Sequence, residues 1–327
     1  MQFRKIVVGL DFTEPSLAAA RGVATFAPAA EIVLAHVIEE HHAPSIARSE
    51  PLTPLASLYP GITGALRGFA NLIGGDRTRF EVLAGDAPTA LAELADREEA
   101  DLVCVGRGRR RRGSARFGAT TAQRLLVRSR VPTIVVPVHL GVPSRILAAV
   151  DDRLGGDYVF ETGCGLGASG EAWVDAIHII ESELHAPAGH GSRTAEPHGR
   201  HHQWSEWPAS IDETDNGWMH ERARKWVDAR LDDVTVTTGR AASVIATGDA
   251  GEEIVRHARQ SNTDLIVIGR GGDASHARAP SGALPLGSVT RLVLWAAPCS
   301  VLVLPLGSRN PDVQRSRSPR ASEGVLQ

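Results

Sequence analysis

Three features that could do chemistry recur in each half of the chain. They are an aspartate after the first apolar run, a histidine and an aliphatic residue at the end of the second, and a glycine-rich turn after the fourth. In the first half these are Asp11, His36–Val37 and the turn from Gly106. In the second half they are Asp151, His178–Ile179 and the turn from Gly269. Parallel strands bring their carboxyl ends to one sheet edge, where ligands bind, so we expect each set to lie together.

The second glycine turn is followed by a helix start that suits phosphate. Gly269 and Gly272 lack Cβ, which lets backbone N–H groups approach an anion closely. Gly287-Ser288 opens a helical stretch whose free N–H groups and positive dipole end favour phosphate. Because most glycine turns only connect elements, a purely structural turn stays an alternative. The aspartate and the second-strand pair at the same edge favour a nucleotide site.

The elements that must position these residues are written twice. Matching residues of the two halves stand at near-constant offsets with two jumps: 140 positions for Asp11 and Asp151, 163 for Gly106 and Gly269, and 168 for Pro137 and Pro305. Chance similarity between apolar strands would not hold register in this way. The offsets indicate duplication of one unit, followed by insertion of loops.

Each unit is predicted to be an α/β domain. Short apolar runs such as IVVGL, IVLAHVI and LVCVG lack polar alternation, which suits parallel strands covered on both faces. Helices are expected between them. Asp249 and Glu252 form a capping pair for one, and Asp86 could cap its counterpart, with Pro88 in the first turn. Alternating strands and helices imply two repeated doubly wound domains, each with a five-stranded parallel sheet.

We place the first domain at residues 1–140 and the second at 145–307, with Gly and Pro in GVPSR between them. Residues 308–327 lack periodicity and are expected to be a disordered tail. A polar segment from about Glu183 to Asn216 is expected to be a loop, with a helix resuming around Trp218 to Leu231. The apolar last strands, TIVVPV and SVLVLP, would be exposed edges unless covered.

Both halves resemble the universal stress protein family, over nearly the whole chain except the loop and the tail. Nucleotide-binding members of that family carry G-x2-G-x9-G-[ST] after the fourth strand. Gly269 and Gly272 fit the first half of this motif, and Gly287-Ser288 with the following VTRLVLWAAPCSVLVLP fits the rest. The spacing departs from the pattern, since 14 residues rather than nine separate Gly272 from Gly287. The insertion lengthens the loop that would hold the phosphates.

The resemblance implies a fold similar to the adenine nucleotide alpha hydrolases and a site for ATP or another adenine nucleotide, with Mg²⁺ accompanying ATP. Asp151 would contact the adenosine and Ile179 would line the adenine. The ribose and phosphates would be held by Gly269, Gly272, Gly287 and Ser288, with Val289 beside them.

The first domain departs further from the family pattern. Gly106 is present, but Arg109, Ala119 and Thr120 stand where the second glycine and the Gly-Ser pair are expected. A Cβ at these positions lies where a phosphate should approach. The weaker counterparts of the site are Asp11, Val37, Gly106 and Thr120. We expect this first site to be degenerate or to bind a different anion.

Two unusual loops carry further hypotheses. The arginine run from Arg107 to Arg116 could bind phosphate or an acidic surface, or could be a solvated loop. It has no interleaved aromatic residues for base stacking, so specific nucleic-acid binding is not expected. Five histidines crowd the polar segment without a metal-ligand spacing, and no metal site is expected there: His185, His190, His198, His201 and His202.

Composition favours a cytoplasmic protein. The net charge is −3, no apolar run reaches the ~18 residues that span a bilayer, and no secretory signal opens the sequence. The three cysteines have no CxxC spacing, which is typical of buried thiols in a reducing compartment. No G-x-S-x-G, HExxH or complete Walker A motif is present, so strong catalysis is not supported.

Three functional hypotheses follow. The first is a stress-response regulator that binds an adenine nucleotide in its second domain, with the two domains docked as an intramolecular pseudo-dimer through their last strands. The second is an interaction scaffold that binds no nucleotide. The third is a slow nucleotide hydrolase, for which the sequence supplies no convincing metal ligands or water-positioning residue. Whether the chain pairs further into a homodimer stays open.

Overall fold

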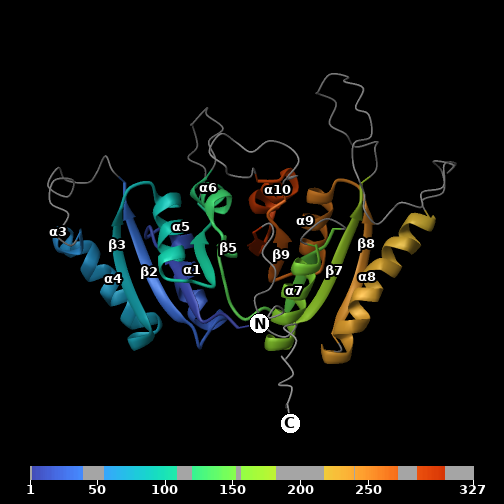
Figure 1. Ribbon diagram of the computed structural model, residues 1–327, viewed down its shortest axis with the longest axis horizontal. Coiled ribbons are helices and arrows are strands. Elements are labelled where there is room, and N and C mark those ends of the chain that lie inside the picture. Colours follow the sequence, from blue (N-terminus) through green and yellow to red (C-terminus); the bar gives the residue numbers. More distant parts are fainter. Residues whose placement is uncertain are drawn as a thin grey trace, which may run out of the picture.

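The protein is built around one mixed sheet, seen in the computed structural model of the chain (Figure 1). The structure describes residues 2–39, 55–108, 120–151, 156–181, 217–238, 240–271 and 286–305. The first-domain strands are β1 (Lys5–Gly9), β2 (Glu31–Ile38), β3 (Thr78–Ala84), β4 (Leu102–Gly106) and β5 (Thr133–Val136). Those of the second are β6 (Arg145–Ala149), β7 (Trp173–Ile180), β8 (Ala241–Thr247), β9 (Leu265–Gly269) and β10 (Ser300–Leu304).

Helices cover both faces of this sheet, as expected for doubly wound domains. One apolar core joins the sheet to α1 (Glu14–Phe26), α4 (Pro60–Ile73), α7 (Gly156–Gly170) and α8 (Gly217–Thr238). A second core, on the other face, joins it to α5 (Ala87–Arg97), α6 (Thr121–Arg128), α9 (Ala250–Gln260) and α10 (Ser288–Ala296). The short helix α3 (Leu55–Leu58) precedes α4.

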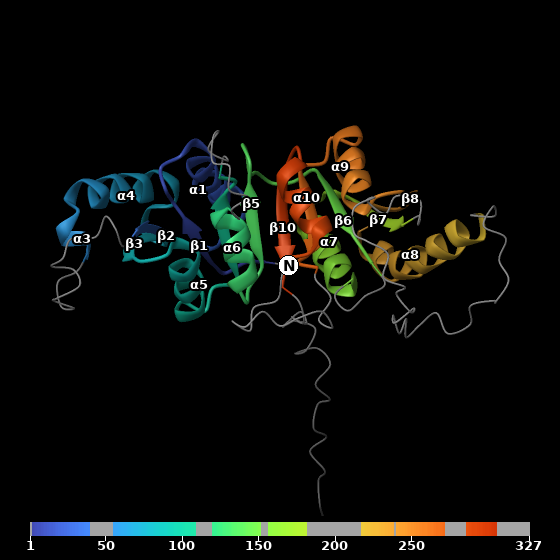
Figure 2. The ribbon, with the colours of Figure 1, turned by 90° about the horizontal axis from the view of Figure 1, so that it is seen from above.

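The two domains meet strand to strand. The sheet order is β3-β2-β1-β4-β5-β10-β9-β6-β7-β8, and the strands within each domain are parallel. β5 and β10 pair antiparallel, with Val301 opposite Val135 and Leu302 opposite Ile134. Figure 2 shows the two strands side by side at the centre of the molecule. The expected pseudo-dimer through the last strands is confirmed, and it covers two edges that would otherwise expose apolar side chains.

The two expected helix caps have different outcomes. Asp249 precedes α9, and its Oδ1 accepts from the Glu252 backbone N–H at 2.9 Å, as predicted. Asp86 precedes α5 but makes no such bond. Its carboxylate instead accepts from the Thr89 hydroxyl at 2.8 Å and pairs with Arg124 at 2.6 Å. Asp86 therefore ties α5 to α6 rather than capping α5.

Several predictions fall on residues whose structure is not described. These are the histidine-rich segment, the tail, most of the arginine run and Gly272. No described helix is long and apolar enough to cross a membrane. Among the described side chains, no group of three or more histidines, cysteines, aspartates or glutamates is placed to hold a metal ion.

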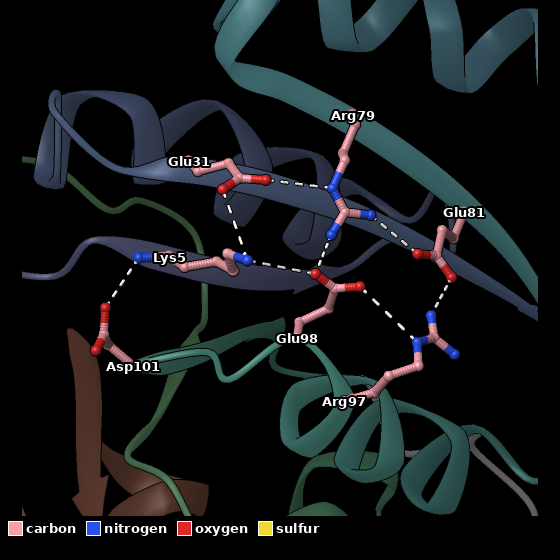
Figure 3. A network of polar contacts seen from close by, with 7 residues as sticks. All are labelled: Lys5, Glu31, Arg79, Glu81, Arg97, Glu98 and Asp101. Atoms are coloured by element: carbon pink, nitrogen blue, oxygen red, sulfur yellow. Dashed lines mark hydrogen bonds and ion pairs between the residues drawn. The ribbon is translucent and has the colours of Figure 1, made fainter.

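A network of ion pairs connects the N-terminal ends of the first-domain strands (Figure 3). Glu98, with a side chain 15% exposed, pairs with Lys5 of β1 at 3.5 Å and with Arg79 of β3. Arg79 also pairs with Glu31 of β2 at 3.2 Å and with Glu81 at 2.9 Å. Because this network lies at the ends opposite the expected site, we assign it to stability.

Among its described residues, the second domain shows no such network and has a different polar group in its core. Asp175 of β7 is 7% exposed and accepts from the Trp173 indole N–H at 2.8 Å. Its other carboxylate oxygen lies 3.3 Å from Nε2 of His257 on α9. The matching residues of the first domain, by the offsets of the repeat, are the apolar Val33 and Leu94. A buried polar pair thus replaces an apolar contact in the second domain only.

This pair predicts an acid-sensitive contribution to stability. Burial raises the pKa of Asp175, but hydrogen bonds from His257 and Trp173 outweigh it and set the pKa below the usual 3.8. A carboxyl group with a lowered folded-state pKa stabilises above its unfolded-state pKa, and that contribution is lost as pH falls through the folded value. We expect Asp175→Asn to lower the free energy of unfolding by about 1–3 kcal/mol at pH 7, with the deficit shrinking below about pH 4.

Urea titrations of both proteins between pH 3 and 7 measure this difference. The double variant Asp175→Val/His257→Leu restores the apolar pair of the first domain and should be more stable than Asp175→Val alone, because neither polar group is then left without its partner. A deficit of Asp175→Asn that stays constant with pH would contradict the assignment.

Candidate functional site

The candidate residues of the second domain lie at the carboxyl edge of three neighbouring strands. Asp151 follows β6, Gly269 ends β9 and Ile179 is near the end of β7. β6 lies between the other two strands in the sheet. The chain leaves β6 toward α7 on one face and leaves β9 toward α10 on the other. This is a topological switch point, the place where open α/β sheets bind ligands.

The glycine turn after β9 is held against the start of α10. The Thr290 hydroxyl donates to the Gly269 carbonyl oxygen at 2.9 Å. The Gly287 N–H donates to the Arg270 carbonyl oxygen at 3.2 Å. Gly271 has a φ of +61°, and a Cβ there would lie 3.4 Å from the Gly287 Cα. This turn therefore requires glycine at 271, a residue that the family motif does not single out.

The start of α10 has no side-chain cap from its N-cap residue. Its N-cap residue is Gly287, which has no side chain to cap the helix. Ser288 is exposed and Val289 partly buried in the first turn. The first N–H groups of any helix lack intrahelical acceptors, and they point out of the helix at its N-terminus, which is the positive end of the dipole. Within the described residues, this helix start has the donors that an anion needs.

The corresponding helix of the first domain begins with a side-chain cap of its own. Thr120 is the N-cap of α6, and its hydroxyl accepts from the Gln123 N–H at 3.3 Å. The Gln123 side-chain oxygen accepts from the Thr120 N–H at 3.0 Å. This is a complete capping box, which takes up two of the groups that would face a ligand. Thr120 therefore has a structural role, in line with a degenerate first site.

The two strand-ending glycines also differ. A Cβ on Gly106 would lie 2.5 Å from the Ser16 nitrogen and 2.6 Å from the Pro15 carbonyl carbon. Gly106 thus allows the start of α1 to pack against β4. A Cβ on Gly269 would meet Val159 at an ordinary 3.7 Å. As far as the described residues go, the Cβ position of Gly269 has space that the Cβ position of Gly106 lacks.

Asp11 is engaged by its own loop. Its Oδ1 accepts from the Thr13 N–H at 3.0 Å and from the Thr13 hydroxyl at 2.6 Å, while its own N–H donates to the Ser16 hydroxyl at 3.3 Å. Burial would raise the pKa of Asp11, but the hydrogen bonds from Ser16 and Thr13 lower it below its usual value. Asp11 is therefore an ionised residue that orders the entry to α1. Val37, another candidate residue of the first domain, is partly buried and packs against the second core.

The two strand-end histidines have matching structural contacts. His36 Nδ1 lies 2.7 Å from the Leu10 carbonyl oxygen, and His178 Nδ1 lies 3.1 Å from that of Val150. Each imidazole thus ties the second strand to the end of the first strand. An aromatic ring packs on each, with centroids 5.2 Å apart for Phe12 and His36 and 5.4 Å apart for Trp226 and His178. These contacts give both histidines a structural role.

The three cysteines are free thiols. Cys104 and Cys164 are buried, and Cys299 is partly exposed. Burial raises the pKa of Cys299 to about 12, which keeps the thiol protonated and a poor nucleophile at neutral pH.

The arginine after each glycine turn has a role that the sequence did not indicate. Arg107, the first residue of the arginine run, is partly buried and contacts the other domain. Its Nη1 donates to the Ala297 carbonyl oxygen of the second domain at 2.8 Å. Arg270 reaches α6 of the first domain in the same way. The repeated Gly-Arg pair was a visible signal, but its meaning depends on how the domains dock.

Comparison with known families decides the identity of the fold. The sequence profile described as "Universal stress protein family" matches residues 2–137 and again 143–305. Together these segments cover most of the chain, once for each five-stranded domain. The chain belongs to the universal stress protein family. The sequence matches none of the curated proteins searched.

Solved structures share the tandem arrangement of this universal stress protein. A universal stress protein from Archaeoglobus fulgidus DSM 4304 is similar with a TM-score of 0.61 and 15% identity, covering 93% of this chain and 97% of its own. A protein of unknown function from Pseudomonas aeruginosa PAO1 has a TM-score of 0.58 and 16% identity, covering 93% of each chain. At these identities, the likeness concerns the fold alone.

Proposed function

We propose that the second domain binds an adenine nucleotide, ATP being the first candidate, and that the protein acts as a stress-response regulator through the bound state. The single observation that carries the proposal is the contrast between the two helix starts. α10 begins at a glycine with no side-chain cap, whereas α6 carries its own capping box. A helix N-terminus that has no side-chain cap among the described residues and lies at a switch point suits a phosphate chain.

Each candidate residue then has a physical task. The amides of Ser288 and Val289, in the first turn of α10, would donate to phosphate oxygens. Gly271 lets the turn after β9 run close to that helix start, so phosphates meet backbone without a Cβ between. Asp151 and Ile179, on the neighbouring strands, stand where the nucleoside would lie. Gly269 and Gly272 would complete the turn.

Mg²⁺ would enter with ATP rather than occupy a protein site. No metal-binding cluster of acidic residues, histidines or cysteines is found in the described part of the chain. Mg²⁺ is commonly held by substrate phosphates and water with one or two carboxylates. Asp151 is the carboxylate at this edge that could serve as one of them.

The proposal is tested by identifying a bound ligand and by measuring stabilisation. Mass spectrometry of the purified protein after denaturation should release an adenine nucleotide. Added ATP, ADP, AMP and cyclic di-AMP should differ in the thermal shift they cause. A ligand present at 100 times its Kd stabilises the fold by ~2.7 kcal/mol.

The outcomes separate the three hypotheses. Neither a released nucleotide nor a shift with any of the four compounds would favour the scaffold instead. Conversion of bound ATP to ADP over hours, in proportion to protein and lost on unfolding, would favour the slow hydrolase.

A further inference from the structure

Two arginines, one from each glycine turn, contact the other domain. Arg107 Nη1 donates to the Ala297 carbonyl oxygen at 2.8 Å, at the C-terminus of α10. Arg270 Nη1 lies 3.0 Å from the Leu126 carbonyl oxygen, at the C-terminal end of α6. The two residues are 163 positions apart, the offset of the glycines before them. Both reach across the β5–β10 pair that joins the domains.

The contacts of Arg270 are the more extensive. Its Nη1 also lies 3.4 Å from the carbonyl oxygens of Val127 and Ser129, and the residue is 8% exposed. None of its described contacts is a carboxylate. The last carbonyl groups of a helix lack intrahelical donors and carry the negative end of the dipole, so they favour a cation. Arg270 therefore completes a helix that belongs to the other domain.

The same residue also fixes the turn in its own domain. The Arg270 N–H donates to the Leu304 carbonyl oxygen of β10 at 2.8 Å, and its carbonyl oxygen accepts from Gly287 at the start of α10. One residue thus touches the helix start that we propose binds phosphate and the helix end across the domain boundary. The Arg107 N–H makes the matching bond to the Val136 carbonyl oxygen of β5.

Through these contacts, the glycine turn of each domain is connected to the C-terminal end of a helix in the other domain. α10 begins at the second-domain edge and ends on Arg107, which comes from the first-domain turn. α6 begins at the first-domain edge and ends on Arg270, which comes from the second-domain turn. We infer that Arg107 and Arg270 are positioning residues that couple the two edges, so that a ligand at the start of α10 steadies α6 in the other domain. The effect of a ligand on α6 rests on the proposed function. The contacts of the two arginines with the other domain do not.

Hydrogen–deuterium exchange on the full chain, without any ligand, tests whether the two arginines stabilise the helix ends that they contact. Arg270→Met removes the donors but keeps an unbranched side chain of similar length. We expect amides in the C-terminal half of α6 to exchange about tenfold faster, because their helix end loses its cationic partner. Arg107→Met should do the same to α10, by a smaller factor, since it has one such contact rather than three.

A matched control comes from the second domain itself. The exposed Arg259 donates to the Ala296 carbonyl oxygen at 3.1 Å, at the same end of α10 but from within its own domain. Arg259→Met should leave α6 unchanged. If Arg270→Met does not fold, Arg270→Lys keeps the charge without the planar donors and should show a smaller acceleration in α6. Unchanged α6 exchange in a folded Arg270 variant would overturn the inference.

Adding ATP separates this inference from the proposed function. In the wild-type protein, ATP should slow exchange at the start of α10 and also in α6. In Arg270→Met, it should slow α10 alone. Protection of α10 without any effect on α6 in the wild-type protein would overturn the coupling while the nucleotide site stands. If ATP protects neither helix, the nucleotide site is overturned, and the ligand-driven coupling with it. The role of the two arginines at the helix ends is tested separately, by the experiment without ligand.

Discussion

Gly106→Ala should lower the free energy of unfolding by about 3 kcal/mol. The new Cβ would lie 2.5 Å from the Ser16 nitrogen and 2.6 Å from the Pro15 carbonyl carbon. Both neighbours are backbone, so α1 must move away from β4 or the strand must shift. A urea titration followed by circular dichroism measures the loss.

Gly269→Ala is the matched control for this substitution. It changes the same position of the repeat, where the nearest atom to the new Cβ is Val159 Cγ2 at 3.7 Å. Neither glycine has a positive φ, so alanine can adopt both backbone conformations. We expect stability to be unchanged or raised by up to about 1 kcal/mol, because alanine restricts the unfolded chain. Equal losses in the two variants would contradict the asymmetry of the two edges.

Ser288→Asp should weaken ATP binding about 100-fold while leaving the protein as stable as before. A carboxylate in the first turn of α10 would accept from the N–H groups meant for phosphate and would repel the phosphate charge. The same carboxylate interacts well with the positive helix end, worth up to about 1 kcal/mol. Loss of binding together with unchanged or higher stability is a combination that a folding defect cannot produce. Isothermal titration and thermal unfolding measure the two quantities.

Thr120→Asp provides the comparison in the first domain. Aspartate can keep the N-cap bond to the Gln123 N–H, so α6 should remain intact. The added charge lies at the start of α6 in the first domain and not at the start of α10, so the Kd for ATP should change little. A loss as large as that of Ser288→Asp would indicate that ATP binds in the first domain, contrary to our proposal.

Much of the architecture could be predicted because it follows from local patterns that repeat. The apolar runs predicted the parallel strands, and the need to cover TIVVPV and SVLVLP predicted the pairing of β5 with β10. The start of α10 at Gly287-Ser288 could also be predicted from the sequence, since a helical pattern begins there. The spacing T-x-x-Q at Thr120 and Gln123 is a capping-box signature and could have been recognised from the sequence.

The remaining features depend on contacts between distant segments. The partner of Arg107 is 190 residues away and that of Arg270 is 144 residues away, so no local pattern reveals them. Gly271, with its positive φ, presses against Gly287 because of how the turn folds back, which glycine spacing alone does not show. Asp86 was predicted as a cap and instead pairs with Arg124, because the packing of α5 on α6 offers its carboxylate a charged partner.

The central claim is that one helix start, in the second domain, holds the phosphates of an adenine nucleotide. Calorimetric titration of the wild-type chain with ATP and Mg²⁺ tests it most directly, because the stoichiometry counts the competent domains. We predict one ATP bound per chain, since α10 begins at a glycine without a side-chain cap and α6 begins with a capping box. No measurable binding, or two equivalent sites per chain, would contradict the account.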